Sequence, residues 1–329
     1  MDYPLVSFIS INYNQSAVTL DFLESVYQIT YPNFEIIIID NASPSDNPDI
    51  LKEKYPKIKL IKAKNNLGFA GGNNLGIIKS SGKYLLFINN DTEVKKDFLE
   101  PMVEAFEKDD KLALASPKII FHHSKEQRLM QYAGGTKINS ITGNGTFIGY
   151  GEIDKNQYKT SYTELIHGAA VMTPMKLMQE VSVWPDIYFL YYEEIDWSEN
   201  FKRKGYKLKY IAESEIYHKE SLSIGKATPL RIFYMTRNRQ LFARRNQKGI
   251  SKLIAFIYFY LATIPKSTIK YILKAEFKLL SAFWRAVVWN ILNAKKMKQT
   301  PTLVVQDESK TIINSFYNYD GELKNIIES

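Results

Sequence analysis

Short apolar runs alternate with amphipathic segments along the first third of the chain. Side chains that are buried on both faces of a parallel sheet give continuous hydrophobic runs, so each apolar run predicts a strand. Between the runs, apolar residues recur at the spacing of a helix. We therefore expect an α/β fold in which crossover helices connect parallel strands. The predicted strands are Val6 to Asn12, Glu35 to Asp40, Ile58 to Ala63 and Lys83 to Asn89, and the predicted helices are Ala17 to Ile29, Gly72 to Ser80 and Phe98 to Lys108.

The middle of the chain carries the same pattern less regularly. Leu112 to Ser116 and His167 to Met172 predict further strands, and Ile187 to Tyr192 leads into a helix that runs from about Glu194 to Lys204. The glycine-rich stretch Gly134 to Gly151 is typical of hairpins or of a mobile loop. We expect this part of the chain to form the second side of a cleft.

Three of the predicted strands end in polar side chains. Amides and carboxylates follow the apolar runs as Asn12-Tyr13-Asn14, Asp40-Asn41 and Asn89-Asn90-Asp91. Open α/β sheets bind ligands at the carboxyl ends of their parallel strands, so these residues should share one edge. Asp91 is then the residue that could hold a metal-bound phosphate. This arrangement favours a nucleotide-dependent enzyme.

Composition narrows the chemistry. The chain has 329 residues, of which 45% are hydrophobic and 13% aromatic, which indicates a globular protein and argues against disorder. It contains no cysteine, so disulfides, thiolate zinc sites and cysteine nucleophiles are excluded. Any metal must then be held by oxygen and imidazole ligands.

Charge is concentrated in one part of the chain. Residues 201 to 300 carry 22 Lys and Arg against 4 Asp and Glu, although the net charge of the whole chain is only +8. Such a basic block indicates an anionic partner, which can be a membrane surface, a phosphorylated substrate or nucleic acid.

The basic block also contains apolar helices. The apolar run Leu253 to Ile264 has 12 residues and is closed by Pro265, which is too short for the roughly 20 residues that span a bilayer. Beyond it, lysines recur every fourth residue and apolar residues fill the opposite side, which predicts one basic amphipathic helix. The lysines are Lys266, Lys270, Lys274 and Lys278, and the apolar residues are Ile269, Ile272, Leu273, Phe277 and Leu280.

Two interpretations of these helices remain open. They can pack on the rest of the protein as a helical subdomain, or they can dock on an anionic membrane. Trp284 and Trp289 lie in the following apolar segment, Leu279 to Leu292, and tryptophan is favoured at the boundary between water and lipid. We therefore expect membrane docking, and the wide apolar face argues against nucleic acid as a partner.

The first residues of the chain indicate where in the cell the protein is located. Met1 to Pro4 lacks the basic region of a secretory signal, and the apolar stretch Leu5 to Ile11 is short and strand-like. We expect a cytoplasmic protein that is peripherally associated with the inner face of the plasma membrane. The sequence leaves its oligomeric state open, with a homodimer among the alternatives.

Six motifs occur in the order and spacing of the family 2 inverting glycosyltransferases. They are N-Y-N at 12–14, D-N-A-S at 40–43, N-N-L-G-F-A-G-G-N-N-L-G at 65–76, N-N-D-T at 89–92, H-G-A-A at 167–170 and Y-Y-E-E-I-D-W at 191–197. Each is weak alone, but six in order are specific. The chain resembles this family over about residues 5–247, and within it the rhamnosyltransferase-like branch that builds bacterial surface polysaccharide.

The resemblance implies a fold and an activity. The fold is GT-A, a Rossmann-like mixed sheet flanked by helices that binds a nucleotide sugar, here with a C-terminal amphipathic helical appendage. The activity is transfer of a sugar, with inversion, from a nucleoside diphosphate donor (dTDP-rhamnose or a UDP-hexose) to a hydroxyl of a lipid-linked or growing surface glycan. A divalent cation, Mn2+ or Mg2+, would assist it.

Two rival functions remain. A catalytically silent glycan-binding or membrane-binding protein could use the same scaffold. A sugar-1-phosphate nucleotidyltransferase is a rival enzyme, but the glycine-rich, Arg- and Lys-containing loop that it needs after the first strand is absent, since Asn12-Tyr13-Asn14-Gln15 stands there.

The resemblance also assigns the metal ligands. Asp91 matches the aspartate that binds the cation in the family, and Asn89 stands where many members have the first aspartate of a D-x-D pair. His218 resembles a late histidine of the family and would add an imidazole ligand, although a lone histidine is more often structural.

The pair Glu193 and Glu194 matches the acidic base motif of the family. Glu194 is the first choice for the base that takes the acceptor proton, and Glu193 is the second. Glu193 and Asp196 would raise the proton affinity of Glu194 by repulsion, whereas the start of a helix would lower it. The alternative is that three acidic residues merely begin a helix.

The remaining assignments concern the two substrates. Asp40 would accept a hydrogen bond from the pyrimidine imide, although Asp-Asn-Ala-Ser also suits a turn or a helix cap. The residues expected to bind the nucleotide sugar are Asn12, Asn14, Asp40, Asn66, Gly68, Asn74, Asn89 and Asn90, and those expected to bind the acceptor are His167, Gly168 and Asp196.

Four arginines follow on a predicted helix, and two interpretations fit them. They can bind a phosphate of the donor or of an acceptor lipid, or they can form a solvated basic face. These residues are Arg237, Arg239, Arg244 and Arg245.

The resemblance and the basic block together predict the domain boundaries. Residues 1–248 form the transferase, with a nucleotide-binding half at 1–116 and an acceptor half at 117–248. Residues 249–300 form the basic membrane-associating segment, and residues 301–329 form an acidic tail.

Overall fold

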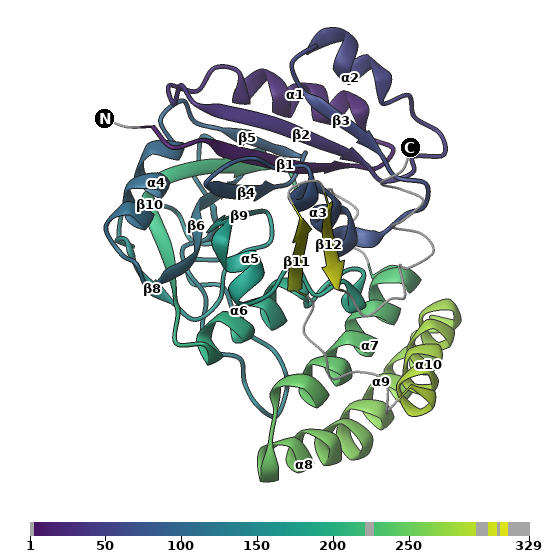
Figure 1. Ribbon diagram of the computed structural model, residues 1–329. Helices are drawn as coiled ribbons and strands as arrows, with labels where there is room; N and C mark the ends of the chain where they lie inside the picture. Colours follow the sequence, from purple (N-terminus) through teal and green to yellow (C-terminus); the bar gives the residue numbers. More distant parts are fainter. Residues whose placement is uncertain (1–2, 221–226, 294–301, 308–309, 315–329) are drawn as a thin grey trace.

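The computed structural model describes residues 3–220, 227–293, 302–307 and 310–314, the last two ranges only as backbone strands. A mixed sheet of ten strands forms the centre of this described part, in the order β3-β2-β1-β4-β9-β6-β10-β5, with β7 paired to β6 and β8 paired to β10 (Figure 1). Its strands are β1 (Val6–Asn12), β2 (Phe34–Asp40), β3 (Lys59–Lys62), β4 (Tyr84–Ile88), β5 (Thr92–Val94), β6 (Leu112–Phe121), β7 (Met130–Tyr132), β8 (Ser161–Thr163), β9 (Ala170–Pro174) and β10 (Lys207–His218).

Helices connect the strands and continue beyond the sheet. Short helical turns occur at His122–Ser124 and Asp186–Tyr188, a π-helical turn occurs at Phe259–Thr263, and β11 (Thr302–Asp307) pairs with β12 (Lys310–Asn314) as a separate hairpin. The helices are α1 (Ser16–Val26), α2 (Asp49–Lys54), α3 (Gly68–Ile78), α4 (Leu99–Glu107), α5 (Lys176–Glu180), α6 (Glu193–Arg203), α7 (Pro229–Asn246), α8 (Gly249–Tyr258), α9 (Ile264–Leu273) and α10 (Phe277–Leu292).

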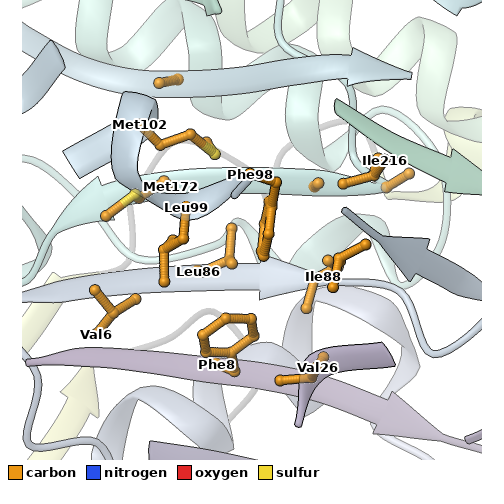
Figure 2. Packing of buried hydrophobic residues seen from close by; sticks show 14 of the residues in the cluster. Val6, Phe8, Val26, Leu86, Ile88, Phe98, Leu99, Met102, Met172 and Ile216 are labelled. Carbon is orange, nitrogen blue, oxygen red and sulfur yellow. The ribbon is translucent and has the colours of Figure 1, made fainter. Parts of the chain in front are cut away.

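The two faces of the sheet bury alternate residues of each strand. In β2, Ile36 and Ile38 lie in the cluster that α1 and α4 cover, whereas Ile37 and Ile39 lie in the cluster that α3, α5 and α6 cover. Figure 2 shows part of the first cluster, where the rings of Phe8 on β1 and Phe98 beside α4 pack with their centroids 6.1 Å apart. The run of four isoleucines therefore exists because this strand is buried on both faces.

Glycines let α3 approach the sheet closely. A Cβ at Gly72 would lie 2.8 Å from Ile11 Cδ1, and a Cβ at Gly76 would lie 2.3 Å from Ile9 Cγ2. Both distances are shorter than carbon atoms tolerate, so the glycine-rich motif of this helix has a packing role against β1.

The strand order brings later segments to the edge where β1, β2 and β4 end. β9 runs antiparallel to β4 and pairs Ala170 with Ile88, which places the turn before β9 beside Asn89. β10 runs antiparallel to β5 and pairs His218 with Thr92, which places His218 beside Asp91. The predicted strands of the first third are all present, and the stretch 134–151 folds back on itself through backbone hydrogen bonds, as a hairpin does.

The C-terminal helices form a layer at one end of the molecule. α10 lies along α7, and α8 and α9 lie farther from the sheet (Figure 1). The prediction of one basic helix from Lys266 to Leu280 is wrong, because Ala275 adopts a left-handed conformation (φ 52°) and separates α9 from α10. Pro265 lies in the first turn of α9, where its missing N–H costs no hydrogen bond.

The predicted acidic tail at 301–329 lies outside the described residues, apart from the backbone of β11 and β12. Across the ranges that the structure describes, none of the helices combines the length and hydropathy that crossing a membrane requires.

Candidate functional site

Polar side chains at the carboxyl ends of β1, β2 and β4 form one hydrogen-bonded network. Asn12 Nδ2 donates to Asp40 Oδ1 (3.0 Å), and Thr19 Oγ1 on α1 donates to Asn12 Oδ1 (2.9 Å). Asn90 Nδ2 donates in turn to Thr19 Oγ1 (2.9 Å). We call these four residues the strand-end network. Parallel register produces it, because Asn12 lies opposite Asp40 in the ladder of β1 and β2.

Asp40 also shapes the turn that follows β2. Its buried carboxylate accepts from Ser43, whose hydroxyl lies 2.5 Å from Oδ1 and whose backbone N–H lies 3.2 Å from Oδ2. The Ser43 hydroxyl accepts from the backbone N–H of Asn14 (2.9 Å), an exposed residue in a left-handed conformation (φ 55°). Asp40 is thus a turn former at the edge of the sheet, and its contact with a nucleotide base stays a prediction.

Asn41 organises the loop that leads into α3. Its Nδ2 donates to Asn66 Oδ1 (3.1 Å) and to Gly68 O (3.1 Å), and its Oδ1 accepts from Leu67 N–H (2.9 Å). Asn66 Oδ1 also accepts from Gly68 N–H (2.9 Å). The predicted residues Asn66 and Gly68 are therefore held against the end of β2.

Gly68 and Asn74 tie α3 to the segment that precedes α6. Gly68 has a φ of +71°, and a Cβ there would lie 2.3 Å from Phe189 O, so only glycine fits. Asn74 is buried, and its amide pairs with the backbone of Trp184 in both directions, at 2.9 Å to the carbonyl and 3.0 Å from the N–H. Both polar ends of the Asn74 side chain are therefore engaged within the protein.

Asp91 and His218 form a close pair beside this network. Asp91 Oδ1 lies 3.1 Å from His218 Nε2, and Asn89 Nδ2 lies 3.4 Å from the same nitrogen. Burial works to raise the pKa of Asp91, but the hydrogen bond and charge of His218 outweigh it, so this pKa lies below its ordinary value. The carboxylate is therefore ionised at neutral pH.

The partners of Gln131 define how His218 faces Asp91. Gln131 Nε2 donates to Glu220 Oε2 (3.0 Å), which directs the amide oxygen to His218 Nδ1 at 2.8 Å. An amide oxygen only accepts, so Nδ1 carries a proton and Nε2 faces the carboxylate. Two atoms that both bind cations then converge at 3.1 Å, which fits a shared proton or a shared metal ion.

The donor set of this pair suits a hard divalent cation. One carboxylate oxygen and one imidazole nitrogen leave most coordination positions open, as an ion that also binds phosphate oxygens and water requires. Over the described residues, no group of three or more His, Asp or Glu side chains gathers around a single point. An ion held by Asp91 and His218 would therefore take its other ligands from water, from amides or from a substrate.

His167 and Gly168 line the edge next to this pair. The ring of His167 lies 6.0 Å from the ring of His218 and 4.7 Å from that of Phe147, and its Nδ1 accepts from Ala169 N–H (3.0 Å). Burial, and then the charge of His218, lower the pKa of His167 to about 3, so the imidazole is neutral. Asn89 N–H donates to Ala169 O (2.9 Å), which joins this turn to the end of β4.

Glu193 and Glu194 begin α6 and differ in environment. Glu193 is buried, and in the described part of the protein its Oε2 has no hydrogen-bond partner. Burial, and then repulsion from Glu194, raise the pKa of Glu193 well above its ordinary value. Burial raises the pKa of Glu194 to about 7. For the pKa of Glu194, desolvation therefore outweighs the lowering effect expected from the start of a helix. The degree of desolvation could not be read from the position of Glu194 in the sequence.

A series of neighbouring residues links the two predicted carboxylates, Asp91 and Glu194. Asp91 contacts His218, the His218 ring neighbours the His167 ring, and the next residue, Gly168, approaches Glu194. A Cβ at Gly168 would lie 3.9 Å from Glu194 Cβ and Cγ. The turn at His167 and Gly168 therefore lies between the end of β4 and the start of α6.

Asp196 lies on the opposite face of α6, toward α7. It is fully buried, and its carboxylate accepts from Arg245 Nη2 (2.9 Å) and from Asn246. Arg239 donates to Thr142 O, and Arg244 donates to Asn290 Oδ1 (2.8 Å). The predicted arginines are thus engaged inside the protein and do not form a solvated basic face.

Residues that hold the site together gave weaker signals in the sequence. Thr19, Asn41, Ser43 and Gln131 each position a predicted residue through one or two hydrogen bonds. Asn41 and Ser43 belong to the D-N-A-S motif at 40–43, next to Asp40, although the sequence assigned them no role of their own. Gln131 lies 87 residues before His218, and nothing local to either residue announces their contact.

The chain is similar to known proteins in both sequence and structure. Residues 7–177, more than half of the chain, match the profile described as glycosyl transferase family 2. A putative teichuronic acid biosynthesis glycosyltransferase, TuaG, of Bacillus subtilis is 34% identical over 31% of this chain and 41% of its own length. A poly-beta-1,6-N-acetyl-D-glucosamine synthase of Staphylococcus epidermidis is 35% identical over 32% of this chain and 26% of its own length. The matched segment thus spans less than half the length of these relatives.

Two solved structures share the fold. GalNAc-T7 with UDP, GalNAc and Mn2+ superimposes with a TM-score of 0.58 at 16% identity, over 78% of this chain and 54% of that protein. The mannosyltransferase PcManGT of Pyrobaculum calidifontis, in complex with GDP-Man and Mn2+, gives 0.55 at 15% identity, over 90% of this chain and 82% of its own. The expected GT-A fold, a mixed sheet flanked by helices, is therefore confirmed.

Proposed function

Because the chain belongs to glycosyl transferase family 2, we propose that it transfers a sugar from a nucleoside diphosphate donor to a hydroxyl of a lipid-linked or growing surface glycan. One observation carries this proposal: the sheet edge that presents the Asp91–His218 pair continues, through His167 and Gly168, to a glutamate whose pKa is about 7. Asp91 and His218 would thus serve the leaving diphosphate, and Glu194 would serve the attacking hydroxyl.

Glu194 is the proposed base. A carboxyl with a pKa of about 7 is partly ionised at neutral pH and has the proton affinity that general-base catalysis favours. It would take the acceptor proton while the acceptor oxygen bonds to the anomeric carbon and the bond to the diphosphate breaks on the opposite face, which inverts the configuration. Burial and repulsion from Glu194 raise the pKa of Glu193 well above its ordinary value, which disfavours a second buried charge beside the proposed base.

Asp91 and His218 are the proposed ligands of a divalent cation, Mn2+ or Mg2+. When bound, such an ion neutralises charge on the leaving diphosphate. The low pKa of Asp91 keeps a full negative charge at this point, and Gln131 holds the His218 ring with Nε2 toward the same point. Two solved neighbours that contain Mn2+ with a nucleotide or nucleotide sugar support the use of a divalent cation by this fold.

The donor would lie along the ends of β1, β2 and β4. Asp40 would accept from the imide N–H of a pyrimidine, and the neighbouring amides would bind ribose and phosphate. These amides are Asn12, Asn14, Asn66, Asn89 and Asn90, with Gly68 as a close backbone approach. Asn74 and Asp196 are engaged within the protein and would act through the segments that they hold. The favoured donor is dTDP-rhamnose, with a UDP-hexose as the alternative.

The acceptor would enter beside the turn at His167 and Gly168. Burial and His218 lower the pKa of His167 to about 3, so the ring is neutral. Because its Nδ1 accepts from Ala169 N–H, its Nε2 carries the proton and can donate a hydrogen bond without adding charge. Gly168 leaves space next to Glu194, since a larger side chain would approach that residue. A sugar hydroxyl held there would be within reach of the proposed base.

The C-terminal helices would dock this enzyme on the inner face of the plasma membrane. Large apolar side chains are exposed from α8 through the π-helical turn and α9 to the start of α10, among them Leu261 (75%), Leu273 (81%) and Phe277 (63%). Lys266, Lys270, Lys274 and Lys278 are exposed in the same region. We define the docking face by its apolar members, Leu253, Ile254, Ile257, Leu261, Ile269, Ile272, Leu273 and Phe277. Apolar side chains beside lysines suit an anionic lipid surface.

A screen of nucleotide sugars tests the proposed function. Each is added to the full chain with and without Mn2+, and thermal stability is measured, because a ligand of the folded state raises the melting temperature. Donors that stabilise the protein are then assayed for transfer or for release of UDP or dTDP. Stabilisation without turnover for any acceptor would favour the rival, a silent glycan-binding protein, and no response to any donor would contradict the proposal.

A further inference from the structure

The loop that leads to Glu193 and Glu194 is held in an unusual backbone conformation. Phe189, Tyr191 and Tyr192 have φ values of 63°, 68° and 76°, a region that side chains disfavour and that glycine normally occupies. Bulky residues stay in this region only where the surroundings hold them. The position of the two carboxylates therefore depends on whatever holds this loop.

Two neighbouring residues of α7 hold its carbonyl groups. Arg237 Nη2 donates to Ile187 O (2.6 Å) and Tyr188 O (2.7 Å). The Asn238 amide nitrogen lies within 3.1 Å of Tyr188 O and within 2.7 Å of the carbonyl oxygens of Leu190 and Tyr191. Both side chains belong to buried residues, so water does not compete for these bonds. Four carbonyl groups between residues 187 and 191 thus accept hydrogen bonds from this one pair of side chains.

α10 supports this pair from behind. The Arg237 guanidinium lies 4.7 Å from the ring centre of Trp289 and 4.9 Å from that of Tyr234, so it contacts aromatic rings of α10 and α7. Asn290 is fully buried and donates to Arg237 O (3.1 Å). Arg244 donates to the side chain of Asn290 (2.8 Å) and to its backbone carbonyl (2.7 Å). α10 is therefore bonded to the segment of α7 that grips the loop.

The other side of the loop rests on α3. Phe69 N–H donates to Phe189 O (2.7 Å), and Gly68 lies against the same carbonyl. The Phe189 ring also stacks on the Tyr234 ring at 5.1 Å. The loop is thus held between the start of α3 and the pair of α7 and α10.

We propose that Arg237 and Asn238, supported by Trp289 and Asn290 of α10, are positioning residues that hold Glu193 and Glu194 in place for proton removal. This inference rests on the proposed function. It gives α10 a positioning role at the candidate site in addition to any role at a membrane. Arginine suits this place better than lysine, because its planar group stacks on rings and donates to two carbonyls at once.

Amide hydrogen exchange of residues 187–194 in the full chain tests the positioning directly. Trp289→Leu and Asn238→Asp should each raise exchange in this loop roughly tenfold, because the first removes the ring that supports Arg237 and the second removes hydrogen bonds to the loop carbonyls. Phe283→Leu is the matched control: Phe283 is a buried aromatic residue of α10 whose ring faces Tyr271, on α9, instead of Arg237. Its loop exchange should equal that of the wild type.

Kinetics with the donor that the wild type uses provide the second readout. In Arg237→Lys, Asn238→Asp and Trp289→Leu we expect kcat to fall about 100-fold, the cost of a base displaced by about 1 Å. The KM for the donor should change by less than about twofold, because the strand-end network is untouched. Arg237→Lys keeps the charge and guards against a variant that fails to fold.

The outcomes separate this inference from the proposed function. Unchanged loop exchange in Trp289→Leu and Asn238→Asp, or equal effects of Trp289→Leu and Phe283→Leu, would overturn the positioning role. Equal losses in kcat and in donor affinity would overturn it as well, since general destabilisation explains them. A wild-type protein that releases no UDP or dTDP from any donor would contradict the proposed function, while the exchange measurement still decides whether these residues hold the loop.

Discussion

The two sides of the candidate site are built in different ways. The strand-end network and the Asp91–His218 pair are placed by strand order, because each residue lies at or directly after the end of a strand or on the helix that follows. Glu193 and Glu194 instead follow a loop of left-handed residues that side chains of α7 hold. Strand order is enough to assemble the strand-end network, whereas a helix that begins after a strained loop needs support from distant segments.

The largest effect should come from replacing Glu194, the proposed base, alone. Glu194→Gln keeps the size of the side chain but cannot take a proton, and we expect kcat to fall about 1,000-fold. Thermal stabilisation by the donor should stay as in the wild type, because the donor side is intact. Glu199→Gln, on the same helix and paired with Lys202 (2.7 Å), is the control. Loss of donor binding in Glu194→Gln would show that the two sides are not separable.

Removing Asp91, on the strand side of the site, should weaken donor binding as well as the rate. We expect Asp91→Ala to lower kcat/KM about 300-fold, within the range for losing an electrostatic contact to the reacting group. It should also abolish the part of donor stabilisation that requires Mn2+. Asp97→Ala, an exposed carboxylate after β5, is the control. Stabilisation that persists with Mn2+ in Asp91→Ala would contradict the ligand assignment.

Charge on the C-terminal helices should affect membrane binding without affecting either side of the site. Each basic residue near an anionic surface contributes about 1 kcal/mol, so replacing Lys270, Lys274 and Lys278 by Glu should weaken binding to anionic vesicles at least about 100-fold. Release of UDP or dTDP in the absence of vesicles should be unchanged. Sedimentation with anionic and with neutral vesicles measures the effect.

Lysines elsewhere provide the control for charge. Lys52, Lys54 and Lys57 are exposed in and after α2, at the end of the molecule away from the C-terminal helices (Figure 1). Replacing these three by Glu changes the net charge equally and should leave vesicle binding close to that of the wild type. An equal loss in both triple variants would show that overall charge, and not the docking face, drives binding.

The smallest expected effect is a pH dependence that distinguishes the two sides. Burial raises the pKa of Glu194 to about 7, so the ionised base is lost as the pH falls below 7, and kcat/KM should fall about tenfold per pH unit there. The pKa of Asp91 is lowered, so its charge persists in the same range. Donor-induced stabilisation should therefore change less than the rate.

Stability measurements check the same assignment. Folded Glu194 holds its proton to a higher pH than unfolded Glu194, so the folded state loses stability as the pH rises from the ordinary pKa of glutamate toward 7. Glu194→Gln stays neutral. Its melting temperature relative to the wild type should therefore rise over this range and become constant above pH 7. A difference that is independent of pH would contradict the raised pKa.

Much of the fold could be predicted because local patterns were sufficient. The run Ile36 to Ile39 indicated a strand buried on both faces, and the parallel register then placed Asp40 opposite Asn12. The prediction of one helix from Lys266 to Leu280 was wrong because lysines that recur every fourth residue look the same in one helix or in two helices joined by a turn at Ala275.

The sequence by itself determined the strands of the first third, the polar residues at their ends and the family, whereas β10, which carries His218, was not predicted. Only the tertiary structure decided which face of α6 presents Glu194, why its pKa is about 7, and that Arg237 grips the loop before it. The physical reason is how far apart in the sequence the interacting residues lie. Strand patterning and register depend on neighbours along the chain and across one ladder, whereas desolvation and a strained backbone depend on atoms that lie many residues away and meet only in the folded protein.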